Sequence, residues 1–208
     1  YFYHHVITKS RKNQHSLRCS FTRELSSLYF YCNLSLIDMK TYETERLLLK
    51  PTDLEDAEFI LQLLNSESFI KYIGDRNVRT IEDAENYIRN RCFPQFERLG
   101  YGSFTVILKE DSSKMGTCGV YARENTDNAP DIGFAFLPEF EGKGYGYESA
   151  NFMKNLVKND FNITKLGGIT VEYNHASRKL LEKLGLKFQK KFFMDGDPEE
   201  LLYFEADI

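Results

Sequence analysis

Residues 131–148 read Asp131-Ile132-Gly133-Phe134-Ala135-Phe136-Leu137-Pro138, then Glu139-Phe140-Glu141, then Gly142-Lys143-Gly144-Tyr145-Gly146-Tyr147-Glu148. The first part is a short apolar run, which predicts a buried strand, and a helical pattern starts at Tyr147. The glycines between them let the backbone approach a ligand closely, and the helix directs unpaired N–H groups at the same place. With the added cation of Lys143, this strand–turn–helix unit predicts a binding site for a phosphate or pyrophosphate.

Two other interpretations of the glycine turn remain open. One is a surface turn ahead of a helix, without a ligand. The other is a dinucleotide-binding turn of the Gly-x-Gly-x-x-Gly type, which Glu172 supports because it ends the next expected strand. However, the glycines are spaced Gly-x-Gly-x-Gly, Tyr147 takes the place of the third glycine, and the interval 138–141 separates strand from turn. A nucleoside-triphosphate P-loop is excluded because no Gly-Lys-Ser/Thr is present here.

The remaining periodicity predicts a mixed sheet with helices, in the α/β or α+β range. The segment from Ile132 to Tyr173 reads as strand, helix, strand, so its two strands should be parallel neighbours. Thr52 and Thr80 are expected to cap the first two helices. About seven strands are expected, at 46–50, 103–109, 115–123, 131–137, 167–173, 187–193 and 201–205. The expected helices cover 57–64, 80–98, 147–161 and 175–184.

The composition is typical of one globular domain. The chain has 208 residues, 42% of them hydrophobic, and a net charge of −4. No apolar run reaches the ~18–20 residues that a membrane-spanning helix needs, so no membrane partner is expected. Residues 1–38 carry a charge of +3, against −7 for residues 39–208. We therefore expect an N-terminal extension, either added or weakly ordered, ahead of a domain at 39–208. Its cations are scattered, so nucleic-acid binding is not expected.

Cysteine and histidine usage argues against a metal site and against a disulfide framework. Cys92 and Cys118 are the only cysteines of residues 39–208, and His175 is the only histidine there. Neither cysteine has a partner at ligand spacing, so we expect buried free thiols. Free thiols indicate a reducing compartment and hence a cytoplasmic location.

Three segments resemble the GNAT superfamily of N-acetyltransferases. The glycine turn at 142–146, after the strand at 134–138, resembles the acyl-CoA pyrophosphate loop. Asn174-His175-Ala176-Ser177, running into Lys183-Leu184-Gly185-Leu186, resembles the superfamily's Asn-x-x-Ser and Lys-Leu-Gly-Phe segments. The opening Thr44-Glu45-Arg46-Leu47-Leu48-Leu49-Lys50-Pro51 resembles that of the ribosomal-protein N-acetyltransferase (Rim-like) branch. The three occur in the superfamily's order, and the resemblance covers about residues 42–206.

The resemblance implies an architecture built around acetyl-CoA. It implies a single, largely antiparallel sheet with helices on both faces, whose central parallel strands splay apart around the cofactor. The pantetheine arm would pair with backbone groups near Phe136 and Leu137. Asn174 would contact the pantetheine amides, although the sequence alone also allows a simple helix cap. The pyrophosphate would be held by the turn residues Gly142, Lys143, Gly144, Tyr145 and Gly146.

The implied reaction transfers an acetyl group from acetyl-CoA to a primary amine by direct attack in a ternary complex. Ser177 matches a position near the thiol sulfur and is the candidate proton donor, whereas Leu181 replaces the tyrosine donor of many superfamily members. Asp131 and Glu172 are the candidate general bases. Glu141 stands where the loop often starts with Gln or Arg, and we expect its carboxylate to point to solvent.

The sequence leaves the acceptor amine open: a peptide or protein N-terminus, or a small-molecule amine such as a polyamine or an aminoglycoside. The negative charge of residues 39–208 favours a cationic acceptor. A non-catalytic acyl-CoA-binding protein of the same fold is the alternative function. The sequence also does not decide between a monomer and a homodimer. Aromatic residues of the last two strands either line an acceptor groove or pack in the core: Phe188, Phe192, Phe193, Tyr203 and Phe204.

Overall fold

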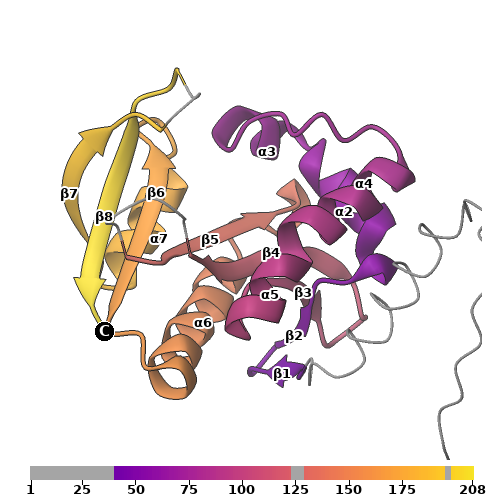
Figure 1. Ribbon diagram of the computed structural model, residues 1–208, viewed down its shortest axis with the longest axis horizontal. Coiled ribbons are helices and arrows are strands. Elements are labelled where there is room, and N and C mark those ends of the chain that lie inside the picture. The colour runs from indigo at the N-terminus through magenta and orange to yellow at the C-terminus, as the bar shows by residue number, and fades with distance from the viewer. Residues whose placement is uncertain (1–39, 123–128, 195–197) are drawn as a thin grey trace, which may run out of the picture. The chain divides into compact units, whose positions relative to one another are not determined.

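The computed structural model describes residues 40–122, 129–194 and 198–208 (Figure 1). The expected extension at 1–38 lies outside them, as do most of the expected loop at 124–130 and the turn at 195–197. The described strands form one sheet of eight, in the order β1-β2-β3-β4-β5-β6-β8-β7. Their bounds are β1 (Tyr42–Glu43), β2 (Leu47–Pro51), β3 (Ser103–Leu108), β4 (Lys114–Tyr121), β5 (Asp131–Phe136), β6 (Lys165–Val171), β7 (Lys187–Phe192) and β8 (Leu201–Asp207).

The sheet confirms the predicted fold class and adds one strand to the expected set. Its neighbouring strands are antiparallel except β5 and β6, the parallel pair predicted from the strand–helix–strand pattern. The additional strand, β1, has only two residues, too few to show an alternating pattern in the sequence. β6 ends at Val171, so Glu172 lies in the following turn rather than at the end of the strand.

Helices cover both faces of the sheet, and the alternation of side chains along β3 shows how. Thr105 faces one side, where its hydroxyl donates to Asp56 at 2.8 Å at the start of α2. Phe104 and Val106 face the other side and join the core beneath α6. The bounds of the helices are η1 (Leu54–Asp56), α2 (Ala57–Leu64), α3 (Glu67–Tyr72), α4 (Ile81–Tyr87), η2 (Ile88–Cys92), α5 (Phe93–Leu99), η3 (Pro138–Phe140), α6 (Tyr145–Phe161) and α7 (His175–Lys183).

Two capping predictions have different outcomes. Thr80 caps α4 as predicted, and Asp83 completes a capping box with it. The prediction for Thr52 is wrong, because Asp53 caps η1 with Asp56 as its partner. Thr52 is instead buried, and its hydroxyl lies 3.2 Å from the hydroxyls of both Ser103 and Thr105. Thr52 and Asp53 each have an acidic residue three positions later, and the contact of Thr52 with β3 leaves Asp53 to act as the cap.

The long helix expected at 80–98 is interrupted. α4 passes into the π-helical turn η2, and α5 then carries Pro94 in its first turn. Proline has no N–H for the preceding turn and its ring crowds the carbonyl four residues earlier, which accounts for the wider turn. Ile81, expected on the apolar side, is 51% exposed, whereas Ala84 and Ile88 are buried as expected.

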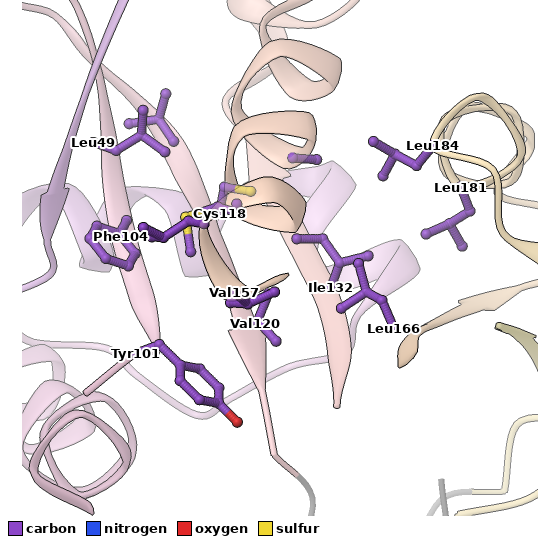
Figure 2. Packing of buried hydrophobic residues seen from close by; sticks show 14 of the residues in the cluster. Leu49, Tyr101, Phe104, Cys118, Val120, Ile132, Val157, Leu166, Leu181 and Leu184 are labelled. Carbon is purple, nitrogen blue, oxygen red and sulfur yellow. The ribbon is translucent and has the colours of Figure 1, made fainter. Parts of the chain in front are cut away.

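The main core lies between the sheet and α6, and α7 extends it across β5 and β6. Figure 2 shows Ile132 and Leu166, from the two parallel strands, with Leu181 of α7 and its C-cap residue Leu184 pointing toward them. Leu181 packs so closely on β6 that a Cβ on Gly168 would lie 2.5 Å from its Cδ2 atom. This close contact fixes the position of α7 beside β6.

The two described cysteines agree with the prediction of buried free thiols. Cys92 and Cys118 are both free and buried. Burial raises the pKa of each thiol to about 12, so neither is a nucleophile at neutral pH. Within the described ranges, no helix has the length and apolar character needed to cross a membrane.

Candidate active site

β5 and β6 are joined at one end only. Their single register pair is Asp131 with Gly167, and the Gly167 N–H donates to Pro130 O at 2.8 Å. Beyond this junction the two strands diverge (Figure 1). By contrast, β5 is paired with β4 along its whole length, from Tyr121–Asp131 to Gly116–Phe136. The sheet therefore opens between β5 and β6 toward their C-terminal ends.

The register of β5 shows which backbone groups face this opening. The Leu137 N–H donates to Met115 O of the β4 side at 2.8 Å. Backbone groups alternate sides along a strand, so Ala135 also bonds toward β4, and Phe134 and Phe136 direct their N–H and C=O groups toward β6. These are the groups an extended ligand could pair with.

Leu137 is less suited to pair with a ligand through its backbone than the sequence predicts. Its N–H is bonded to Met115, and its carbonyl accepts from Phe140 N at 2.9 Å. The side chain of Leu137 is also buried. The backbone groups of β5 that remain for a ligand are therefore those of Phe136 and of Phe134, a residue that the sequence does not predict as a binding residue.

The glycine turn presents a run of unbonded N–H groups. Gly142 and Gly144 have φ of 72° and 86°, in the left-handed region that favours glycine, and α6 begins directly after them. Within the described residues, none of the N–H groups from Gly142 to Tyr147 donates a hydrogen bond. Glu141 is exposed, as predicted. The turn and the first turn of α6 together form an arrangement suited to an anion.

Arg46 contacts the glycine turn and the first turn of α6. Its Nη1 donates to Lys143 O at 3.2 Å, its Nε pairs with Glu148 at 2.7 Å, and its guanidinium stacks 4.5 Å from the Tyr145 ring. Glu148 also accepts from Thr44 Oγ1 at 2.6 Å and from Arg46 N at 2.9 Å. Partial burial favours the protonated form of Glu148, but these bonds outweigh it and hold the pKa below its ordinary value.

Asn174 and Ser177 lie together at the start of α7. Asn174 is the N-cap, since its side-chain oxygen accepts from Ser177 N at 3.0 Å. Ser177 lies four residues before Leu181, on the same face of α7 and one helical turn closer to the C-terminal end of β6. Leu181 itself is 1% exposed in the core, so this position offers no proton donor.

The end of β5, the start of α6 and α7 converge at Gly146. A Cβ placed there would lie 3.1 Å from Leu180 Cδ1 of α7 and 3.5 Å from Phe136 Cε2 of β5. The structure thus brings the predicted turn residues, Phe136 and the helix that carries Ser177 to one end of the opening.

The two predicted general bases, Asp131 and Glu172, lie outside this group of residues and have different surroundings. Asp131 is 3% exposed at the joined end of β5 and β6. Asp131 is paired with Gly167 of β6. β6 ends four residues later at Val171, about 13 Å away along the strand, and the chain turns there toward Ser177. Glu172 is exposed and pairs with Lys191 at 3.0 Å, and this ammonium lowers the pKa of Glu172 and makes it a weaker base.

The aromatic residues of β7 and β8 divide into two groups. Tyr203 and Phe204 are buried, in agreement with core packing, whereas Phe188 and Phe193 are 52% and 62% exposed. His175 is exposed at the start of α7. In the described part of the chain, no three His, Cys, Asp or Glu side chains group as metal ligands would.

Comparison with known proteins agrees with this geometry. A family model described as an acetyltransferase (GNAT) domain matches residues 46–187. The chain belongs to this family, whose members use acetyl-CoA, and is an N-acetyltransferase. The uncharacterized N-acetyltransferase YoaA of Bacillus subtilis (strain 168) is 26% identical over 149 residues, 72% of this chain and 82% of YoaA.

Two further similarities concern proteins whose names include an acceptor. The spermidine N(1)-acetyltransferase of Escherichia coli (strain K12) is 21% identical over 152 residues, 71% of this chain and 78% of that enzyme. The solved structure of the ribosomal alpha-N-protein acetyltransferase RimL in complex with coenzyme A has a TM-score of 0.70 and 15% identity. That match covers 81% of this chain and 98% of RimL, and it shows a shared fold.

Proposed function

We propose that the protein transfers the acetyl group of acetyl-CoA to a primary amine by direct attack within a ternary complex. The observation that carries this proposal is the opening between β5 and β6, with the unbonded N–H groups of residues 142–147 at its open end. A pyrophosphate at the turn and an extended arm along β5 account for both features.

In this proposal the residues around the opening hold acetyl-CoA. The backbone of Gly142 to Gly146, with the side chain of Lys143, binds the pyrophosphate. The N–H and C=O groups of Phe134 and Phe136 pair with the pantetheine arm. Asn174 uses its oxygen as the cap of α7, which leaves its amide N–H₂ group to bind a pantetheine carbonyl.

The thioester end of the arm then lies between the turn and the strand junction. The amine nitrogen forms a bond to the acetyl carbon while the carbon–sulfur bond breaks, and Ser177 donates a proton to the leaving sulfur. Asp131, which lies about 13 Å along the strand from the end of β6 that leads to Ser177, accepts through intervening water molecules the proton that the amine releases. Asp131 is at an odd position of β5 and so faces away from α6, on the side from which an acceptor would approach. Glu172 is less suited because Lys191 neutralises it.

The acceptor in this proposal is a cationic amine, either a polyamine or the free N-terminus of a peptide or protein. Two features support it: the negative charge of residues 39–208 and the acceptors named for similar proteins. A cytoplasmic location, where acetyl-CoA is present, forms part of the same proposal.

An acceptor panel with the 208-residue chain tests this proposal. We expect acetyl-CoA to release free thiol with spermidine or with a peptide that has a free N-terminus, but not with the same peptide acetylated. Asp131→Asn should lower kcat by about a hundredfold, as for loss of a general base, while Glu172→Gln should leave kcat nearly unchanged. Acetyl-CoA binding without thiol release from any amine would favour the non-catalytic alternative.

A further inference from the structure

The Lys143–Gly144 peptide bond links Arg46 to the proposed pyrophosphate site. In a trans peptide, the C=O of one residue and the N–H of the next point in opposite directions. Arg46 Nη1 holds the Lys143 carbonyl at 3.2 Å on one side of the turn. The Gly144 N–H must therefore point to the other side, away from Arg46 and toward solvent.

Arg46 is itself fixed by contacts from the start of α6. Glu148 binds Arg46 through both its side-chain Nε and its backbone N–H, and Thr44 donates to the same carboxylate. The Tyr145 ring covers the guanidinium from the other side. Residues 44–46 thus reach across 102 positions of sequence to hold the first turn of α6 and the peptide before it.

We propose that Arg46, fixed by Thr44 and Glu148, is a positioning residue that holds the glycine turn with its N–H groups directed at the acyl-CoA phosphates. This inference rests on the proposed function for the identity of the ligand. The orientation of the turn is a property of the protein alone, so it can be tested without any ligand.

Charge adds a second reason for an arginine at this position. Glu148 lies in the first turn of α6, the same turn that presents N–H groups to the anion. An unpaired carboxylate there would repel a pyrophosphate, and Arg46 neutralises it. A lysine could neutralise Glu148, but its single ammonium lacks the fork that reaches the carboxylate and the Lys143 carbonyl together.

NMR relaxation of the unliganded protein tests the positioning role. Arg46→Ala should lower the order parameters of the backbone N–H groups of residues 142–147, because the turn loses the bond that holds the Lys143 carbonyl, and Arg46→Lys should retain the melting temperature but show most of the same change. Arg79→Ala is the matched control, because Arg79 also binds a carboxylate, that of Asp75, and a backbone carbonyl, that of Val78. Order parameters unchanged from wild type in both Arg46 variants would overturn the inference.

Steady-state kinetics separates this role from a general loss of stability. Arg46→Ala and Arg46→Lys should raise the KM for acetyl-CoA by about tenfold and leave the KM for the amine unchanged. An equal rise in both KM values, or none in either, would contradict the positioning role. If wild-type protein shows no acetyl-CoA binding, the proposed function fails, whereas the relaxation experiment still decides whether Arg46 holds the turn.

Discussion

The two sides of β5 differ in how completely the backbone is bonded. Toward β4, the strand is paired from Asp131 to Phe136 without a break. Toward β6, it has one register pair, at Asp131, and the groups of Phe134 and Phe136 face an opening. The first side continues through β3 to β2 as a closed ladder, whereas the second leaves backbone groups for a ligand.

The closed side also holds a buried carboxylate that is paired with two lysines. Asp56 is 0% exposed and accepts from Thr105 at 2.8 Å, while Lys114 lies 2.6 Å and Lys50 3.3 Å from its carboxylate oxygens. On the open side, the run of N–H groups at 142–147 has no acceptor within the described residues. The difference teaches that the unpaired backbone groups of β5 and of the glycine turn lie near one another, where a ligand can bond them.

The largest effect is expected from the closed side. Asp56→Ala removes the buried carboxylate that binds Lys114, Lys50 and the Thr105 hydroxyl, and of the two lysines Lys50 keeps a second carboxylate, that of Asp53 at 2.9 Å. The unfolding free energy should therefore fall by about 3 kcal/mol. The protein that remains folded should bind acetyl-CoA as wild type does. Urea denaturation and calorimetry measure the two quantities, and weaker acetyl-CoA binding by folded protein would show that the two sides are not separate.

The pH dependence of the same group gives a second check on this prediction. Burial works to raise the pKa of Asp56, but Lys114, the Asp53 N–H, Thr105 and Lys50 lower it overall from 3.8. A lowered folded-state pKa contributes stability above pH ~4 and loses it as the pH falls through the folded value. Asp56→Ala should therefore flatten the acid limb of the stability curve. Asp75→Ala, which removes an exposed ion pair with Arg79, should leave the curve nearly unchanged.

Single backbone substitutions in β5 should have smaller effects, and these should differ between residues that bond toward β4 and residues that face the opening. Replacing the amide N–H of Ala135 by an ester oxygen removes a bond to β4 and should lower the unfolding free energy by about 1 kcal/mol. The same replacement at Phe134 removes an N–H that faces the opening. It should leave stability unchanged and weaken acetyl-CoA binding by about tenfold. A loss of stability at Phe134 equal to that at Ala135 would contradict the assignment of the open side.

The features predicted from sequence are local ones. The strand at 131–137, the glycine turn and the helix after it are contiguous, so their pattern predicts both the parallel pair and the anion site. Thr80 could be predicted as a cap because its partner, Asp83, is three residues away. The same local logic was wrong at Thr52, where a contact with β3, about 50 residues away, outweighs it.

The features that sequence reasoning missed depend on distant contacts. Thr44-Glu45-Arg46 is part of a recognisable sequence motif, but its partner Glu148 is 102 residues from Arg46, and no sequence pattern links them. The same applies to Glu172, whose ion pair with Lys191 on β7 makes it a poor base. Which of β5's backbone groups are unbonded also follows from its register with β4 and not from residue type.

Calorimetric titration of the 208-residue chain with acetyl-CoA, alongside Gly144→Val, tests the central claim most directly. The φ of 86° at Gly144 is one that a β-branched residue rarely adopts, so the substitution should weaken acetyl-CoA binding by at least about a hundredfold. Gly74→Val, at a φ of 100° outside the turn, is the control and should bind acetyl-CoA normally. Equal acetyl-CoA binding by Gly144→Val and wild type, or a preference of wild type for NADH, would contradict the account.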